Sequence, residues 1–186
     1  AIPIIVNSTS EDDLSLSVEA IKKAITPKTK IIILNTPSNP SGIIVNQDKL
    51  KAISEIAIQN NLVVISDEVY KTLMYDSTDY KSIVNFPGMR ERTIIINSLS
   101  KQFCMTGWRI GYVLASEEIV GAMTKFQENI AACAPLPSQY AAIEALSGKV
   151  NYSANMLAEF KRRRDVLYEG FSKIKYISCN KPQATF

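Results

Sequence analysis

The chain alternates short runs of β-branched residues with segments of helical periodicity, and this alternation limits its possible folds more than any other feature. The strand candidates are continuous apolar runs such as Ile31-Ile32-Ile33-Leu34, which are typical of parallel strands covered on both faces. Between these runs, apolar residues recur every three or four positions, as they do in crossover helices. The sequence therefore predicts an α/β fold, a three-layer αβα sandwich around a mainly parallel sheet.

We expect strands in the first part of the chain and only helices in the last part. The predicted strands are Ile2–Val6, Lys30–Leu34, Leu62–Ser66, Thr93–Asn97 and Gly111–Ala115. Beyond them, one helix is predicted to start after Ser116, a second is capped by Ser138, and a third runs over about residues 156–171. We find no internal repeat or Gly/Ser-rich linker, so no domain boundary is predicted within the chain.

Composition excludes several classes of protein. The chain has no histidine, which removes Ser-His-Asp hydrolysis, Cys-His proteolysis and histidine-liganded metal sites. Its three cysteines form no Cys-x-x-Cys pair, so we expect no metal centre. No apolar run approaches the ~20 residues of a membrane span, and no signal peptide is evident. We therefore expect no membrane partner and take a cytoplasmic location as the default.

Charge gives no reason to expect nucleic acid as a partner. The net charge is only +3. The run Lys161-Arg162-Arg163-Arg164 is basic, but four consecutive residues of a helix spread over roughly 300° and cannot form one basic face. We expect this run to be a solvated helix surface.

Polar side chains gather where three of the predicted strands end. The segments are Asn35-Thr36-Pro37-Ser38-Asn39-Pro40-Ser41-Gly42, Asp67-Glu68-Val69-Tyr70 and Ser98-Leu99-Ser100-Lys101. Ligands of open parallel sheets bind outside the carboxyl ends of the strands, so we expect these side chains to meet at one edge. Arg109, eight residues after Lys101, reaches the same edge if the chain loops back.

Taken singly, each of these residues has an ordinary structural explanation. Asp67 or Ser98 could cap a helix, Lys101 could be a surface lysine, and Tyr70 a half-buried aromatic. Together they offer an amine for a Schiff base, an anion for a ring nitrogen, donors for a phenolic oxygen, and hydroxyls with a guanidinium for a phosphate. A binding site for a phosphorylated pyridine aldehyde requires this set of groups. No G-x-G-x-x-G or G-x-x-x-x-G-K-[ST] segment favours a dinucleotide or a nucleoside triphosphate instead.

The same segments, with Gly107-Trp108-Arg109-Ile110-Gly111, closely resemble the class I and II pyridoxal-phosphate aminotransferases, the aspartate aminotransferase superfamily of fold type I. Their order and spacing match as well, and the resemblance extends to Pro182-Gln183-Ala184-Thr185-Phe186. Ser41 stands where threonine is more usual, but it retains the hydroxyl. The resemblance implies pyridoxal 5'-phosphate as the cofactor, no metal, and a last strand antiparallel to the others.

The resemblance also implies which residues bind the cofactor and how. These are Asn39, Asp67, Tyr70, Ser98, Ser100, Lys101 and Arg109. Lys101 would hold the cofactor as a Schiff base and serve as the acid/base catalyst. Asp67 would pair with the ring nitrogen of the cofactor. Asn39 and Tyr70 would donate hydrogen bonds to its phenolic oxygen. Ser98 and the arginine would hold the phosphate, with Ser100 as a helper.

The activity implied is a pyridoxal-phosphate-dependent transamination, which moves an amino group from an amino acid, aspartate-like by resemblance, to a 2-oxo acid such as 2-oxoglutarate. A homodimer is expected. Residues 1–186 would form part of the cofactor-binding large domain, inactive alone, with upstream strands and a C-terminal small domain outside the chain. Two alternatives stay open: a carbon–sulfur lyase or synthase on the same fold, and a non-catalytic aminotransferase-like sensor domain of a transcriptional regulator.

Overall fold

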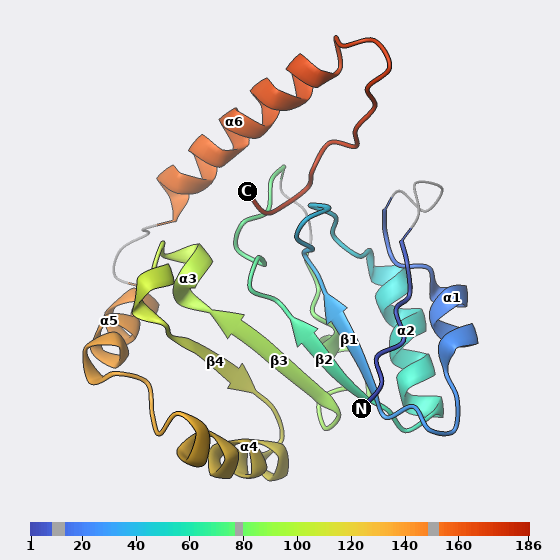
Figure 1. The fold of residues 1–186 in the computed structure, drawn as a ribbon, viewed down its shortest axis with the longest axis vertical. Coiled ribbons are helices and arrows are strands. Elements are labelled where there is room, and N and C mark those ends of the chain that lie inside the picture. The colour runs from blue at the N-terminus through green and yellow to red at the C-terminus, as the bar shows by residue number, and fades with distance from the viewer. Residues whose placement is uncertain (9–13, 77–79, 149–152) are drawn as a thin grey trace.

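The computed structural model describes residues 1–8, 14–76, 80–148 and 153–186, which form one sheet with helices around it (Figure 1). The strands are β1 (Ile31–Asn35), β2 (Val63–Asp67), β3 (Thr93–Ser98) and β4 (Gly111–Leu114). They lie in the order β1-β2-β3-β4; the first three are parallel and β4 is antiparallel to β3. The predicted α/β fold with a mainly parallel sheet and a reversed last strand is confirmed.

The helices occupy the crossovers and the last part of the chain. They are α1 (Val18–Ala24), α2 (Gln47–Gln59), α3 (Leu99–Gln102), α4 (Glu117–Ile130), α5 (Leu136–Leu146) and α6 (Ala154–Phe171), with the 3-10 turns η2 (Ile83–Asn85) and η3 (Thr106–Trp108). Ser138, predicted as a cap, lies inside α5, and its Oγ donates to the Trp108 carbonyl at 2.8 Å. No helix in the described ranges is both long and apolar enough to cross a membrane.

Helix α2 connects β1 to β2 and packs on one face of the sheet. It begins at Asn46, whose Oδ1 accepts a hydrogen bond from the Lys49 N–H at 2.9 Å. Leu50, Ile53 and Ala57 recur at helical spacing and are buried in one cluster with inward-facing residues of β1 and β2. This burial places β1 and β2 side by side and in the same direction, as a βαβ crossover requires.

The other face of the sheet is apolar but exposed along β1. Ile31 and Ile33 are 50% and 72% exposed, and Ile96 of β3 is 37% exposed. The sequence predicted strands covered on both faces, but along β1 buried and exposed residues alternate. A continuous apolar run therefore indicates a strand whose second face is apolar, without showing what covers it.

The predicted strand Ile2–Val6 is wrong, and the sheet of the described chain has four strands rather than five. Ile2, Ile4 and Ile5 are 88%, 66% and 75% exposed, and Val6 packs against the core. A β-branched run favours extended backbone, but a strand also needs a neighbour to share its hydrogen bonds, and the described residues pair no strand with this segment. The ends of the other predicted strands are correct to within one residue.

Residues 182–186, which we call the C-terminal segment, tie together two turns at the edge of the sheet. The Gly42 carbonyl accepts hydrogen bonds from Gln183 N at 2.8 Å and Ala184 N at 3.0 Å. Thr185 N donates to the Leu73 carbonyl at 2.8 Å. The turn after β1 and the segment after β2 are therefore held by residues more than a hundred positions further along the chain.

We predict that Gly42→Ala destabilises this arrangement. Gly42 has a φ of +68°, and a Cβ placed there would lie 2.6 Å from the Cβ of Pro182. Left-handed strain and the clash together cost about 1–3 kcal/mol, which a thermal melt would report as a lower midpoint. Gly170→Ala in α6 is the matched control, because no heavy atom lies within 4 Å of its added Cβ. Equal thermal midpoints for the two variants would contradict the close contact between Gly42 and Pro182.

Arg164 anchors α6 and corrects the prediction for the basic run. Arg162 and Arg163 are exposed, as expected, but the Arg164 side chain is only 6% exposed. Its Nη1 lies 2.8 Å from Asp76 Oδ2 and donates to the Pro182 carbonyl at 3.0 Å. Arg164 therefore connects α6 to both the C-terminal segment and the chain beyond β2.

The Asp76 ion pair predicts a defined pH dependence of stability. Hydrogen bonds from Arg164 and then Lys161 lower the pKa of Asp76 from 3.8 to about 2. Because the folded pKa is depressed, the stabilisation is present above pH 3.8 and is lost as pH falls through about 2. The thermal midpoint of Asp76→Asn should therefore lie below that of the unmutated protein at neutral pH, with the gap closing below pH 4. A gap independent of pH would contradict this.

Candidate active site

The carboxyl ends of the parallel strands place the predicted site residues at one edge. Asn35 of β1 is in register with Asp67 of β2, and Asp67 is in register with Ile96 of β3. The Asp67 carbonyl accepts a hydrogen bond from Thr36 N at 3.2 Å, and Glu68 N donates to the Ile96 carbonyl at 3.0 Å. The three segments that leave these strands therefore start side by side.

Asn39 and Tyr70 are brought together by the turns that follow β1 and β2. The Asn39 Nδ2 donates to the Tyr70 hydroxyl oxygen at 2.9 Å. Tyr70 is buried and Asn39 is exposed, so the pair lies at the margin between core and solvent. The two residues predicted to share one ligand oxygen are thus direct neighbours.

Lys101 reaches the same place from α3, the short helix after β3. Its Nζ lies 4.9 Å from the centre of the Phe186 ring, a cation–π contact. The Tyr70 ring packs against the same phenylalanine, with ring centres 5.8 Å apart. Phe186 was not predicted as a site residue, because only the hydrogen bonds of the C-terminal segment bring it there.

Asp67 ends β2 with a half-buried side chain. Its Oδ1 accepts a hydrogen bond from Val69 N at 3.2 Å. The chain continues from β2 as turns rather than as a helix, so the alternative that Asp67 caps a helix is wrong. The carboxylate is held by a local turn at the edge where Tyr70 and Lys101 also lie.

Ser98, Ser100 and Arg109 form a second polar group beside Lys101. The Ser98 Oγ accepts from Ser100 N at 3.1 Å and donates to the Ile110 carbonyl at 3.3 Å. Arg109 is exposed, with a left-handed φ of 51°, and its Nη1 donates to the Thr106 carbonyl at 2.8 Å. The Ile110 carbonyl is bonded to Ser98, so the backbone next to Arg109 returns to the same edge, as the prediction required.

Gly111 makes this return possible. A Cβ at Gly111 would lie 2.7 Å from the carbonyl oxygen of Asn97, so β4 approaches β3 closer than a side chain allows. The approach sets the register in which Ser98 lies opposite Gly111. A glycine is therefore required two residues after the arginine if the hydroxyl and the guanidinium are to share an edge.

The donor set suits a phosphorylated pyridine aldehyde. An amine, a carboxylate and a bonded amide–phenol pair gather around three strand ends, and hydroxyls with a guanidinium lie beyond the amine. The amine suits the aldehyde, the anion suits a protonated ring nitrogen, and the hydroxyls and guanidinium suit a phosphate. The residues present therefore fit this cofactor.

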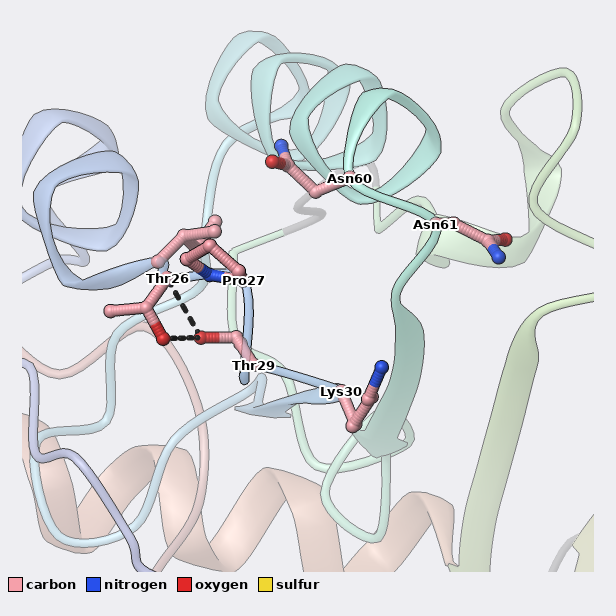
Figure 2. Close-up of a pocket in the computed structure, with 7 residues that line it drawn as sticks. Thr26, Pro27, Thr29, Lys30, Asn60 and Asn61 are labelled. Atoms are coloured by element: carbon pink, nitrogen blue, oxygen red, sulfur yellow. Dashed lines mark hydrogen bonds between the residues drawn. The ribbon is translucent and has the colours of Figure 1, made fainter.

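A separate pocket of about 270 Å³ lies at the opposite ends of the strands (Figure 2). It is lined by residues that precede β1 and β2, including Thr26, Thr29, Lys30 and Asn60. Thr26 N donates to Thr29 Oγ1 at 2.9 Å, so part of its polar lining is bonded internally. It contains none of the predicted site residues, and ligands of such sheets bind at the carboxyl ends, so we do not take it as the active site.

The whole chain, residues 1–186, matches the sequence profile described as "Aminotransferase class I and II". It is 38% identical over 186 residues to an aspartate aminotransferase of Bacillus sp. (strain YM-2), covering 100% of this chain and 47% of that relative. It is also 38% identical over 186 residues to aromatic-amino-acid aminotransferase 2 of Thermococcus litoralis, covering 99% and 48%.

A solved structure gives the same result for the fold. The aromatic aminotransferase from Pyrococcus horikoshii OT3 superposes with a TM-score of 0.94 at 38% identity, covering 99% of this chain and 50% of that one. The fold is thus that of the aminotransferases of fold type I, and the chain belongs to the class I and II aminotransferase family, whose members depend on pyridoxal phosphate. The chain spans about half the length of the relatives it matches.

We predict that Tyr70→Phe weakens cofactor binding without unfolding the protein. The ring keeps its contact with Phe186, but the hydrogen bond to Asn39 is lost. The hydroxyl predicted to donate to the phenolic oxygen of the cofactor is lost with it. One hydrogen bond is worth about 1 kcal/mol, so the Kd for pyridoxal phosphate should rise roughly fivefold in absorbance titrations of the complete protein. Tyr140→Phe, at a tyrosine that is 67% exposed, is the control and should leave the Kd unchanged. An unaltered Kd in Tyr70→Phe would remove the residue from the site.

Proposed function

We propose that the complete protein is a pyridoxal-phosphate-dependent aminotransferase that transfers the amino group of an aspartate-like amino acid to 2-oxoglutarate, with the cofactor held on Lys101 as a Schiff base. The observation that carries the proposal is the position of the Lys101 amine at the sheet edge shared with Asp67, Asn39 and Tyr70. Membership of the aminotransferase family supports it. When bound, the cofactor supplies an electron sink for the charge left on the substrate α-carbon.

Lys101 has two roles in this proposal. Its amine would tether the cofactor between turnovers and, once free, would take the proton from the substrate α-carbon and deliver it to the aldehyde carbon of the cofactor. The cation–π contact with Phe186 gives a position beside the site to the ammonium that forms when the free amine has taken up the α-proton. The lysine therefore stays within reach of the proton that it transfers.

The carboxylate and the amide–phenol pair set the protonation of the cofactor. Asp67 would pair with the ring nitrogen and keep it protonated, which would strengthen the electron sink. Asn39 and Tyr70 act on the phenolic oxygen as hydrogen-bond donors, and this stabilises its anionic form. The three side chains, which lie at or after the ends of β1 and β2, would thus set the protonation of the ring nitrogen and of the phenolic oxygen.

Ser98, Ser100 and Arg109 are proposed to hold the phosphate. The two hydroxyls donate hydrogen bonds, and the guanidinium supplies charge and directional donors. Arg109 is exposed in the described chain, so it can turn from the Thr106 carbonyl towards an anion with little rearrangement. These three residues would then hold the cofactor within reach of the Lys101 amine.

The substrate and the assembly are further parts of the proposal. Relatives are named as aspartate and as aromatic-amino-acid aminotransferases, so assays should compare L-aspartate with L-phenylalanine, with 2-oxoglutarate as the acceptor. We propose a homodimer in the cytoplasm, as the family resemblance implies. We also propose that residues 1–186 are part of the large domain of a longer enzyme, consistent with their match to 47% of the Bacillus relative.

We predict that Lys101→Ala abolishes covalent attachment of the cofactor. In the complete protein with pyridoxal phosphate, borohydride should fix the cofactor onto the peptide that contains Lys101, and the variant should show no such label and no transamination. Lys125→Ala in the exposed part of α4 is the control and should behave like the unmutated protein. A label that persists in Lys101→Ala, or maps to another lysine, would contradict the proposed function.

A further inference from the structure

Glu68 is a buried carboxylate for which the proposed mechanism has no use. Its side chain is 1% exposed. It accepts hydrogen bonds from the Ser66 Oγ at 3.1 Å and from the Ser82 Oγ, and its Oε2 lies 3.6 Å from Lys71 Nζ. Tyr80 is a further neighbour: burial and the adjacent carboxylates of Glu68 and Asp67 raise its pKa. Four polar side chains thus converge on one carboxylate inside the protein.

Glu68 and Asp67 point to opposite sides of the chain. Successive side chains alternate at the end of a strand, so Glu68 lies on the side of Ser66, towards the core, while Asp67 lies on the other side. With 1% exposure and a place in the core, Glu68 is not positioned to exchange protons with a substrate. It is instead positioned to fix the direction of its neighbour.

The polar group around Glu68 also reaches the turn that carries Asn39. The Tyr80 hydroxyl donates to the Thr36 carbonyl at 3.3 Å. Thr36 N donates to the Asp67 carbonyl at 3.2 Å, and Thr36 Oγ1 accepts from Val45 N at 3.0 Å, across the base of the turn. One carboxylate therefore holds both segments from which the anion and the amide of the site arise.

A buried charge is a poor way to add stability alone. Removing a carboxylate from water is costly, and a well-packed apolar side chain often stabilises as well or better. Its specific advantage is geometric, because hydrogen bonds to a charged group fix direction as well as distance. The arrangement around Glu68 therefore indicates a role in orientation.

We propose that Glu68 is a positioning residue for the cofactor: through Ser82, Lys71 and Tyr80 it orients Asp67 and the Asn39–Tyr70 pair towards the ring. The inference rests on the proposed function. In Glu68→Gln, which lacks the carboxylate, the ring-nitrogen anion and the donors to the phenolic oxygen loosen together. The donors stabilise the anionic phenolic oxygen, so their loosening favours the protonated form of the bound chromophore, and the pH at which it loses its proton rises.

The test uses Glu68→Gln in the complete protein loaded with pyridoxal phosphate. We expect the pH midpoint of the absorbance transition to rise by about half a unit or more, and the Kd for the cofactor to rise roughly fivefold. Leu50→Ala is the control, because Leu50 is 1% exposed and is buried in the apolar cluster under the same sheet. It should lower the thermal midpoint at least as far while leaving the pH midpoint unchanged.

The possible outcomes distinguish a failure of the inference about Glu68 from a failure of the proposed function. If Glu68→Gln lowers only the thermal midpoint and keeps the pH midpoint and the Kd, Glu68 is merely structural and the inference is overturned. If the unmutated protein shows no cofactor absorbance, the proposed function fails instead. Should Glu68→Gln not fold, Tyr80→Phe keeps the half-buried ring and removes the hydroxyl; the same upward shift is expected, and its absence would overturn the inference.

Discussion

The hydrogen-bonded register of the parallel strands is the constraint on which the site depends. Asn35 lies beside Asp67, and Asp67 beside Ile96, so three chain segments leave the sheet at one level. A slip of one residue in β2 would turn Asp67 into the core and bring Glu68 to the ligand side, because side chains alternate along a strand. The chemistry of the edge is therefore set by packing that occurs far from it, in the crossover helix and its core.

Contacts between distant segments of the chain hold the turns that the strand register brings together. The C-terminal segment joins the turn at Gly42 to the segment at Leu73, and it carries Phe186 to the Lys101 amine. Arg164 fastens this segment to α6 through the Pro182 carbonyl. The site is thus supported by the sheet on one side and by the last residues of the described chain on the other.

Much of the site could be predicted from the sequence, because its residues directly follow apolar runs that are easily recognised as strands. Asp67 and Lys101 are of this kind. Phe186 and Arg164 are not: their positions depend on contacts between distant segments, and no local pattern distinguishes them from a core aromatic and a surface arginine. The strand predicted at Ile2–Val6 failed for a related reason, since propensity is local but pairing needs a neighbour.

The central claim is that one small ring touches the ends of three neighbouring strands at once. A crystal structure of the complete protein with pyridoxal phosphate tests it most directly. The account predicts electron density continuous from Lys101 Nζ to the cofactor, the ring nitrogen within hydrogen-bonding distance of the Asp67 carboxylate, and Ser98 on the phosphate. A cofactor joined to a different lysine, or a ring nitrogen turned away from Asp67, would contradict it.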